Sequence, residues 1–171
     1  MLIETGLIIC KIGKCLGIEI ERKYLVKSDD WKSLGEKKYY QQGYLLIDRS
    51  RTLRIRIVDN FGFLTIKGSS IGISRSEFEY KIPVDDAKFM LENLCEKPLI
   101  EKYRSKIKLD EITWEVDEFI GENEGLIVAE VELKNKNQKF NIPDWIGEEV
   151  TGNSKYNNSY LVKHPFKKWK N

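Results

Sequence analysis

The sequence predicts an α+β domain built mainly from antiparallel β-strands, and three features of the chain lead to this prediction. Apolar and polar residues alternate with a period of two through most of residues 18–133, as they do in strands that bury one face. Short breaks rich in glycine, aspartate and asparagine divide this region into strand-sized segments. Helical spacing of apolar residues is limited to shorter stretches, so we expect helices that flank the strands.

Size and charge limit the possible function classes. The 171 residues, 41% of them hydrophobic, suffice for one globular domain with a core. The 29 lysine and arginine residues nearly balance the 27 acidic residues, and the net charge of +2 does not predict a nucleic-acid partner. Three cysteines without zinc-type spacing and a single histidine argue against a zinc site and against a Cys/His or Ser/His catalytic pair.

Two further features bear on location. No stretch of the sequence approaches the roughly 20 apolar residues that cross a membrane. Free thiols are compatible with a reducing compartment. We therefore expect a cytoplasmic protein without a membrane partner, and the sequence leaves its oligomeric state open.

The first 17 residues are expected to form an extension that precedes the domain. They are mildly apolar, but Glu4, Lys11 and Lys14 interrupt them and no cleavage site of small residues follows. The domain itself is predicted to comprise residues 18–171. It contains no internal repeat or linker that would divide it.

Breaks between the predicted strands fall at Gly35 and at residues 48–50, 59–60, 68–72 and 121–125. One helix is predicted from the start signal at residues 83–86 to Cys95, because apolar residues recur there at helical spacing. These residues are Ala87, Met90, Leu91 and Leu94. A second helix is predicted from about residue 153 to about residue 164, and residues 31–34 are expected to be helical or irregular.

Each predicted strand has one charged and one apolar face, because alternate residues of a strand point the same way. The charged faces comprise, in chain order, Glu19, Glu21 and Lys23; Arg54 and Arg56; Thr65 and Lys67; Arg75, Glu77, Glu79 and Lys81; Lys102, Arg104, Lys106 and Lys108; Thr113, Glu115 and Asp117; and Glu130 and Glu132. Two interpretations fit this pattern. A half-exposed sheet would turn its charged face to water. A closed barrel would enclose that face, and its buried charges would need opposite charges or bound ligands.

The first strand also suggests a chemistry. Glu19 and Glu21 offer two hard oxygen ligands on the same face as the ammonium of Lys23. Mg²⁺ is usually held by one or two carboxylates together with phosphate oxygens of a substrate. This strand could therefore contribute to a minimal site for a divalent metal and a polyanion.

Eight motifs in order resemble the CYTH superfamily of triphosphate tunnel metalloenzymes over residues 18 to about 163. They are Glu-Ile-Glu-Arg-Lys-Tyr-Leu-Val (19–26), Gln-Gly-Tyr-Leu (42–45), Arg-Ile-Arg (54–56), Thr-Ile-Lys-Gly (65–68), Glu-Phe-Glu (77–79), Lys-Tyr-Arg (102–104), Glu-Val-Glu (130–132) and Gly-Glu-Glu-Val-Thr (147–151). The resemblance implies a closed eight-stranded antiparallel β-barrel with helices packed outside. It also implies metal-dependent hydrolysis or rearrangement of a triphosphate inside the tunnel.

The resemblance assigns roles to the charged residues. Those that match phosphate-binding positions are Lys23, Arg54, Arg56, Lys67, Lys102, Arg104 and Lys155. Those that match the acidic lining, which would hold Mg²⁺ or Mn²⁺, are Glu19, Glu21, Glu77, Glu79, Asp117, Glu130 and Glu132. Of these, Glu19, Glu21, Glu130 and Glu132 are expected to bind the metal directly, and others to hold neighbouring cations.

Two residues are candidates for catalysis. The family context makes Tyr44 a candidate proton acceptor, and Lys23 is the competing candidate. An unperturbed tyrosine has a pKa near 10 and would need nearby cations to ionise at neutral pH. Tyr44 could equally be a packing residue. The remaining chemistry would need only positioning and electrostatic stabilisation for an in-line attack by water.

The short single-domain form looks most like the bacterial inorganic tripolyphosphatase type. We therefore expect a hydrolase that cleaves the terminal phosphoanhydride of tripolyphosphate or a related small triphosphate. The alternatives are a class IV-like adenylyl cyclase, a thiamine or nucleoside triphosphatase, and a non-catalytic polyphosphate-binding module. Recognition of a nucleoside or thiamine should require an aromatic or apolar pocket at the tunnel mouth, to which Trp31, Trp145 and Tyr156 could contribute.

Overall fold

The computed structural model describes residues 18–169, so the predicted extension over residues 1–17 lies outside the described residues. The strands are β1 (Ile18–Val26), β2 (Lys37–Ile47), β3 (Arg51–Val58), β4 (Phe61–Ile71), β5 (Ser74–Ile82), β6 (Ile100–Leu109), β7 (Ile112–Phe119), β8 (Ile127–Glu132) and β9 (Ile146–Glu149). The helices are α1 (Val84–Asn93) and α2 (Asn158–Lys163), with short 3-10 turns η1 (Gly121–Asn123), η2 (Ser154–Tyr156) and η3 (Phe166–Lys168).

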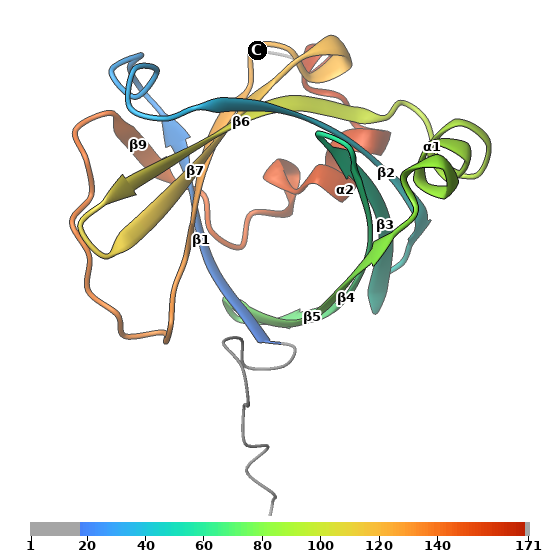
Figure 1. Ribbon diagram of the computed structural model, residues 1–171. Coiled ribbons are helices and arrows are strands. Elements are labelled where there is room, and N and C mark those ends of the chain that lie inside the picture. The colour runs from blue at the N-terminus through green and yellow to red at the C-terminus, as the bar shows by residue number, and fades with distance from the viewer. Residues whose placement is uncertain (1–17, 170–171) are drawn as a thin grey trace, which may run out of the picture.

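The first eight strands form a closed antiparallel barrel (Figure 1). Hydrogen bonds connect them in the order β5, β4, β3, β2, β6, β7, β8 and β1, and β1 pairs with β5 to complete the ring. Closure removes the free edges that an open sheet would expose. The eight-stranded barrel expected from the resemblance is therefore confirmed.

An additional strand, β9, was not predicted. It pairs with the C-terminal half of β1, whereas β5 pairs with the N-terminal half of the same strand. The two strands therefore share one edge of β1. A four-residue strand is too short for alternation to reveal it in the sequence.

The apolar faces of the strands point outward, and much of this surface is buried beneath other parts of the chain, whereas Phe78 and Tyr80 of β5 stay exposed. The largest cluster joins Tyr24 and Trp114 on the barrel to Trp31 and Trp145 on the connections. The ring centroid of Trp114 lies 5.6 Å from that of Tyr24 and 5.7 Å from that of Trp145, in edge-to-face contacts. Residues 29–35, which include the predicted helical or irregular piece, form turns and bends.

Helix α1 covers another part of the outer surface. It begins after Pro83 and buries Ala87 and Leu91 against residues that include Ile55 and Leu64. This confirms the predicted helix, which ends slightly earlier than expected because Leu94 already leaves the helical run.

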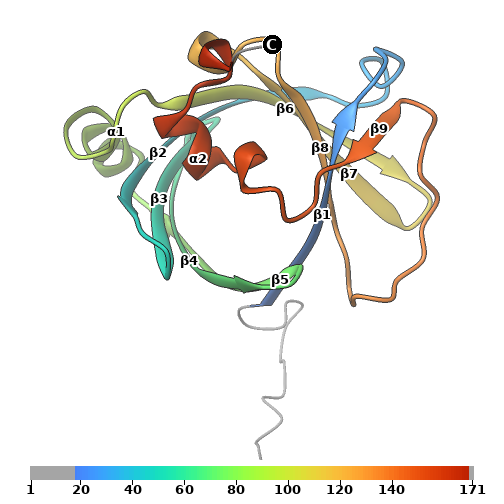
Figure 2. The same cartoon turned by 180° about the vertical axis from the view of Figure 1, so that it is seen from behind.

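Helix α2 packs into one end of the barrel and is shorter than predicted. Its buried residues Leu161 and Val162 pack against inward-facing side chains of the barrel, namely Tyr44, Ile100, Phe119 and Val128. Figure 2 shows α2 within the outline of the ring of strands, on the side of β2 and β3. The predicted helix is divided because residue 157 is extended between η2 and α2.

The closed barrel decides whether the charged faces of the strands point to water or to the interior. The apolar alternate residues form the outer clusters, so the charged ones line the interior. None of the described helices is long and apolar enough to cross a membrane.

Candidate active site

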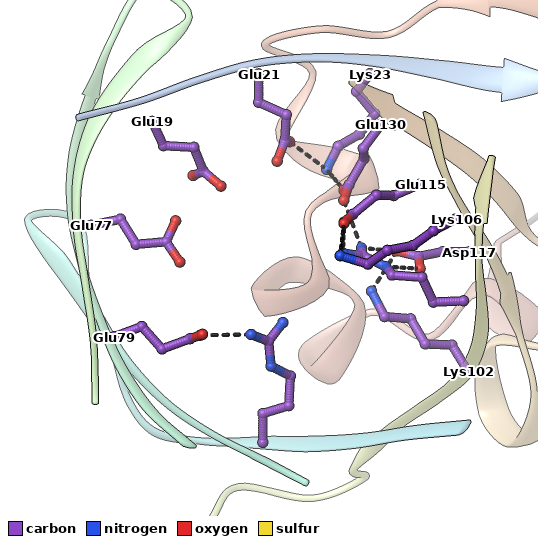
Figure 3. A network of polar contacts seen from close by, with 12 residues as sticks. Glu19, Glu21, Lys23, Glu77, Glu79, Lys102, Lys106, Glu115, Asp117 and Glu130 are labelled. Carbon is purple, nitrogen blue, oxygen red and sulfur yellow. Dashed lines mark hydrogen bonds and ion pairs between the residues drawn. The ribbon is translucent and has the colours of Figure 1, made fainter. Parts of the chain in front are cut away.

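Charged side chains from opposite walls converge on the barrel interior (Figure 3). A cavity of about 290 Å³ opens there. Its lining includes Glu19, Glu21 and Lys23 of β1, Arg75 of β5, and the segment around Thr151. The first-strand motif thus projects into the cavity as its alternation predicts.

Strands β1 and β8 contribute a mixed row of acids and one lysine. In the strand register Glu21 lies opposite Glu132, and Lys23 lies opposite Glu130. The Lys23 Nζ atom is 2.8 Å from Glu130 Oε1 and 3.5 Å from Glu21 Oε1. Burial lowers the pKa of Lys23, but the charges of Glu130 and Glu21 outweigh it and leave that pKa raised.

Negative charge accumulates around Glu21. Burial raises the pKa of its carboxyl group, and the neighbouring charge of Glu130 raises it further. The pKa of Glu130 itself is held well below its ordinary value, because Lys23 and Arg104 outweigh the effect of its burial. The neighbouring cations at this end of the interior therefore stabilise the charge of Glu130 more than that of Glu21.

Glu19 joins β1 to the neighbouring strand β5 and to β4 beyond it. Its Oε2 atom accepts hydrogen bonds from Arg75 Nε at 2.6 Å and from Lys67 Nζ at 3.3 Å. Lys67 also lies 2.9 Å from Glu77, and Arg75 lies 3.9 Å from Glu21. Each of these cations is thus shared between two carboxylates.

The wall formed by β3, β4 and β5 centres on two arginines. Arg56 Nη2 donates to Glu79 Oε2 at 2.6 Å, and Arg54 Nη2 donates to Thr65 Oγ1 at 3.1 Å. Arg54 also lies 3.8 Å from Glu77. Burial lowers the pKa of Arg56, and the charge of Arg54 lowers it further. The wall therefore carries a concentration of positive charge.

The wall formed by β6 and β7 contains the most deeply buried ion pairs. Asp117, 1% exposed, accepts from Arg104 Nε and Nη2 at 2.6 Å each and from Lys102 Nζ. Arg104 also donates to Glu130 at 2.7 Å and to Glu115. Burial, with the charge of Arg104, lowers the pKa of Lys102 to about 8.

Tyr44 lies in the middle of β2, among the side chains packed by α2. Burial raises the pKa of its hydroxyl, although the charges of Arg54, Arg75 and Lys23 oppose this shift. The hydroxyl is therefore close to the cations but protonated at neutral pH in the absence of ligand.

The structure brings together the predicted residues of the barrel strands but places Lys155 differently. The Lys155 Nζ atom lies 3.9 Å from the centroid of the Trp169 ring, in a cation–π contact with the C-terminal segment. Conversely, Arg75 was not predicted as a binding residue. It shares the alternation of Glu77 and Glu79, and this signal could have identified it.

The carboxylates supply the type of donor that a hard divalent cation prefers. Within residues 18–169, however, no three of the His, Cys, Asp or Glu side chains stand close enough together to hold a metal as they lie. The acids of β1 and β5 are instead paired with lysine and arginine. Metal binding would require these pairs to change partners.

Comparisons with known proteins agree with this architecture. A family model described as the CYTH domain matches residues 17–160. The chain is 54% identical over 155 residues to an inorganic triphosphatase of Acetivibrio thermocellus, a match that covers 91% of this chain and 99% of the relative. It is 37% identical over 148 residues to an inorganic triphosphatase of Nitrosomonas europaea, covering 84% and 96% of the two chains.

Solved structures show the same similarity. The crystal structure of the inorganic triphosphatase NE1496 matches with a TM-score of 0.62 and 34% identity, over 84% of this chain and 93% of that one. The family model covers most of the chain, and seven of the eight sequence motifs fall on barrel strands, while the eighth begins on β9. The chain therefore belongs to the CYTH domain family.

Proposed function

We propose that this protein hydrolyses inorganic triphosphate, cleaving its terminal phosphoanhydride inside the barrel with the help of Mg²⁺ or Mn²⁺. The observation that carries the proposal is the enclosure of cations on both walls of the interior, with Arg54, Arg56 and Lys67 on one wall and Lys102 and Arg104 on the other. Relatives named inorganic triphosphatase, at 54% and 37% identity, support it.

Substrate binding would proceed by an exchange of partners. Without ligand, Arg56 is paired with Glu79, and Lys67 and Arg75 are paired with Glu19. A triphosphate offers oxygens that compete with these carboxylates, and the arginine fork can hold two of them at once. The carboxylates released on the β1 side then become available to a cation that accompanies the substrate.

The acids of β1 and β8 suit that cation in chemistry and position. Glu21 and Glu132 are direct cross-strand neighbours, so their carboxylates offer hard oxygen ligands from two adjacent strands. Glu19, Glu21, Glu130 and Glu132 would hold the metal, which when bound polarises the phosphoryl group or lowers the pKa of water. Asp117 is occupied by Lys102 and Arg104, so we propose that it positions these cations.

The remaining chemistry is positioning and charge stabilisation by the chain itself. The cations neutralise the phosphate chain and the charge that develops in an in-line displacement. Both proton-acceptor candidates, Lys23 and Tyr44, have raised pKa values without ligand. Binding of substrate and metal would therefore have to change the surroundings of either side chain before it could accept a proton. The assignment of the proton acceptor remains a prediction.

The cavity lining supports an inorganic substrate. Among the described residues that line it none is aromatic, and several carry only a hydroxyl or no side chain, such as Ser70, Gly72 and Gly152. Trp31 and Trp145 are buried in the outer cluster, and Tyr156 contacts Trp169. Within this cavity a thiamine or nucleobase ring would find no aromatic side chain for stacking, whereas a phosphate chain needs only charges and hydroxyls.

We further propose that the protein acts in the cytoplasm on this small molecule, without a nucleic-acid or membrane partner. The free, buried thiol of Cys95 is compatible with a reducing compartment.

Turnover of tripolyphosphate, ATP and thiamine triphosphate with Mg²⁺, Mn²⁺ or chelator tests the proposal. We expect phosphate release that is fastest from tripolyphosphate and is abolished by chelator, with no cyclic AMP from ATP. Replacing Arg54 and Arg56 together by glutamine should lower kcat/KM about 100-fold or more, because two charge-assisted contacts are lost.

Arg51→Gln is the matched control, because Arg51 lies on the same strand but is exposed and forms an ion pair with nearby Asp48. Its activity should remain close to that of the wild type. Folded protein that releases no phosphate from any of the three substrates with either metal would refute the proposal.

A further inference from the structure

A glutamine lies inside the barrel with no partner for its amide. Gln42 of β2 is 0% exposed, and neither Nε2 nor Oε1 forms a hydrogen bond to any described residue. Leaving a buried polar group unpaired costs about 1–3 kcal/mol. Such a group in a folded protein therefore requires an explanation.

The strand register places Gln42 between the two cationic walls. It lies opposite Arg56 of β3 and opposite Ile100 of β6, and cross-strand partners point to the same face of a sheet. Tyr40, two residues earlier on this face, lies opposite Lys102. The Gln42 side chain therefore points into the interior where the predicted phosphate-binding residues converge.

The unpaired groups in this region are mainly donors. The Nε atoms of Arg54 and Arg56 are also buried and have no hydrogen-bond partner among residues 18–169. Together with Gln42 Nε2 they form a group of N–H donors on two adjacent strands. Arginine and lysine side chains cannot accept hydrogen bonds, whereas phosphate oxygens can only accept them. These three donor atoms therefore lack an acceptor among the described residues, and a phosphoryl group would supply one.

We propose that Gln42 is a binding residue for the triphosphate, and that its Nε2 donates to a nonbridging phosphoryl oxygen beside Arg54 and Arg56. This proposal rests on the function proposed above and adds an uncharged residue to its binding site. The Oε1 atom is an acceptor and can take a hydrogen bond from a water molecule at the same phosphoryl group.

Gln42→Met tests the proposal, because methionine has a similar shape but no amide. The thermal unfolding midpoint without ligand should be unchanged or higher, since two unpaired polar atoms leave the interior. The value of kcat/KM for tripolyphosphate should fall about 10- to 100-fold. The rise in midpoint that tripolyphosphate produces in the wild type should shrink correspondingly.

Gln41→Met is the matched control. Gln41 is the adjacent residue on the same strand, faces the other side of the sheet, and donates to Glu101 at 3.4 Å. It should keep both the activity and the ligand-induced midpoint shift. As a second variant, Gln42→Glu replaces the Nε2 donor by an acceptor and should fold because a carboxylate there can pair with Arg56. It should lose tripolyphosphate binding at least as strongly as Gln42→Met.

The outcomes separate this proposal from the proposed function. A midpoint shift in the wild type that Gln42→Met weakens, without turnover by either protein, would support the role of Gln42 and contradict hydrolysis. Normal activity of Gln42→Met, or a lower midpoint without ligand, would overturn the role of Gln42 alone. A wild-type protein with neither shift nor turnover would overturn both.

Discussion

Single residues show how closely the buried charges depend on their partners. Lys102 is 2% exposed, and its only ion pair among the described residues is with Asp117. Burial and the nearby charge of Arg104 outweigh that carboxylate and lower the pKa of Lys102 to about 8. The folded barrel thus holds this ammonium at a cost, which suits a site that gains a polyanion when substrate binds.

Lys102 also gives the folded protein a predictable response to pH. An unfolded lysine has a pKa near 10.4, so between about pH 8 and 10.4 the unfolded chain binds more protons at this position than the folded one. Stability from this group therefore rises with pH. The free energy of unfolding of the wild type relative to Lys102→Met should increase by about 2 kcal/mol between pH 7.5 and 9.5.

Urea unfolding of both proteins with chelator present measures this difference. Lys108→Met, which removes an exposed lysine from the same strand, is the control for losing a lysine from β6. A difference between wild type and Lys102→Met that is constant over this range, or that falls as pH rises, would contradict the prediction.

At the scale of secondary-structure elements, α2 determines the shape of the site. By packing on Tyr44, Ile100 and Phe119 it fills one end of the barrel with apolar side chains. The charges are thereby confined to the rest of the interior. The helix has only six residues, so its stability comes from this packing rather than from its own hydrogen bonds.

Leu161→Ala should therefore destabilise the protein by about 2–5 kcal/mol, because it leaves a cavity in the packing that holds α2 against the barrel. Leu94→Ala is the control, since Leu94 is 57% exposed at the end of α1, and its loss should cost much less. Chemical denaturation of the two variants tests this. Equal stabilities would show that α2 is not a packed closure of the barrel.

The sequence predicted the elements that have a long repeating signal. Alternation identified the strands of the barrel and the residues that share a charged face, but not whether that face points to water or to the interior, and helical spacing identified α1. It failed for β9, which has four residues, and for the division of the second helix at residue 157. In both cases the outcome depends on contacts with distant parts of the chain, such as the edge of β1.

Residues of the candidate site were likewise predictable where they lie on strands with a long alternating signal. Residues on the barrel strands, such as Glu19 and Arg104, converge because alternation and closure place them inside. Lys155 lies in a 3-10 turn and contacts Trp169, a contact that no local pattern reveals. The unpaired amide of Gln42 is likewise a property of the packed interior.

At the scale of the whole molecule, the barrel interior divides into two regions with different pairing. On the β6–β7 side, Lys102 and Arg104 converge on Asp117 in the most deeply buried pairs. On the β1–β5 side, Lys67 and Arg75 each have a second carboxylate besides Glu19, and this side lines the cavity. In the first region Asp117 holds the two cations in place, whereas in the second region the cations can exchange their carboxylate partners for a ligand.

This division predicts opposite effects for two conservative substitutions. Asp117→Asn should cost about 3–5 kcal/mol of stability, because it leaves Lys102 buried without a carboxylate. Glu19→Gln should cost about 1 kcal/mol or less, because Lys67 and Arg75 keep Glu77 and Glu21 as partners. Yet Glu19→Gln should lower metal-dependent turnover of tripolyphosphate about 100-fold or more, since it removes an expected metal ligand.

Urea unfolding with chelator, followed by turnover assays over a range of Mg²⁺ concentrations, measures both effects on the same preparations. Because the ion pairs of Glu19 are less buried than those of Asp117, its stability effect should also decrease more strongly with added salt. If Glu19→Gln proved as destabilising as Asp117→Asn while retaining activity, the carboxylates of β1 would be structural partners of the cations. The metal would then have to bind elsewhere in the barrel.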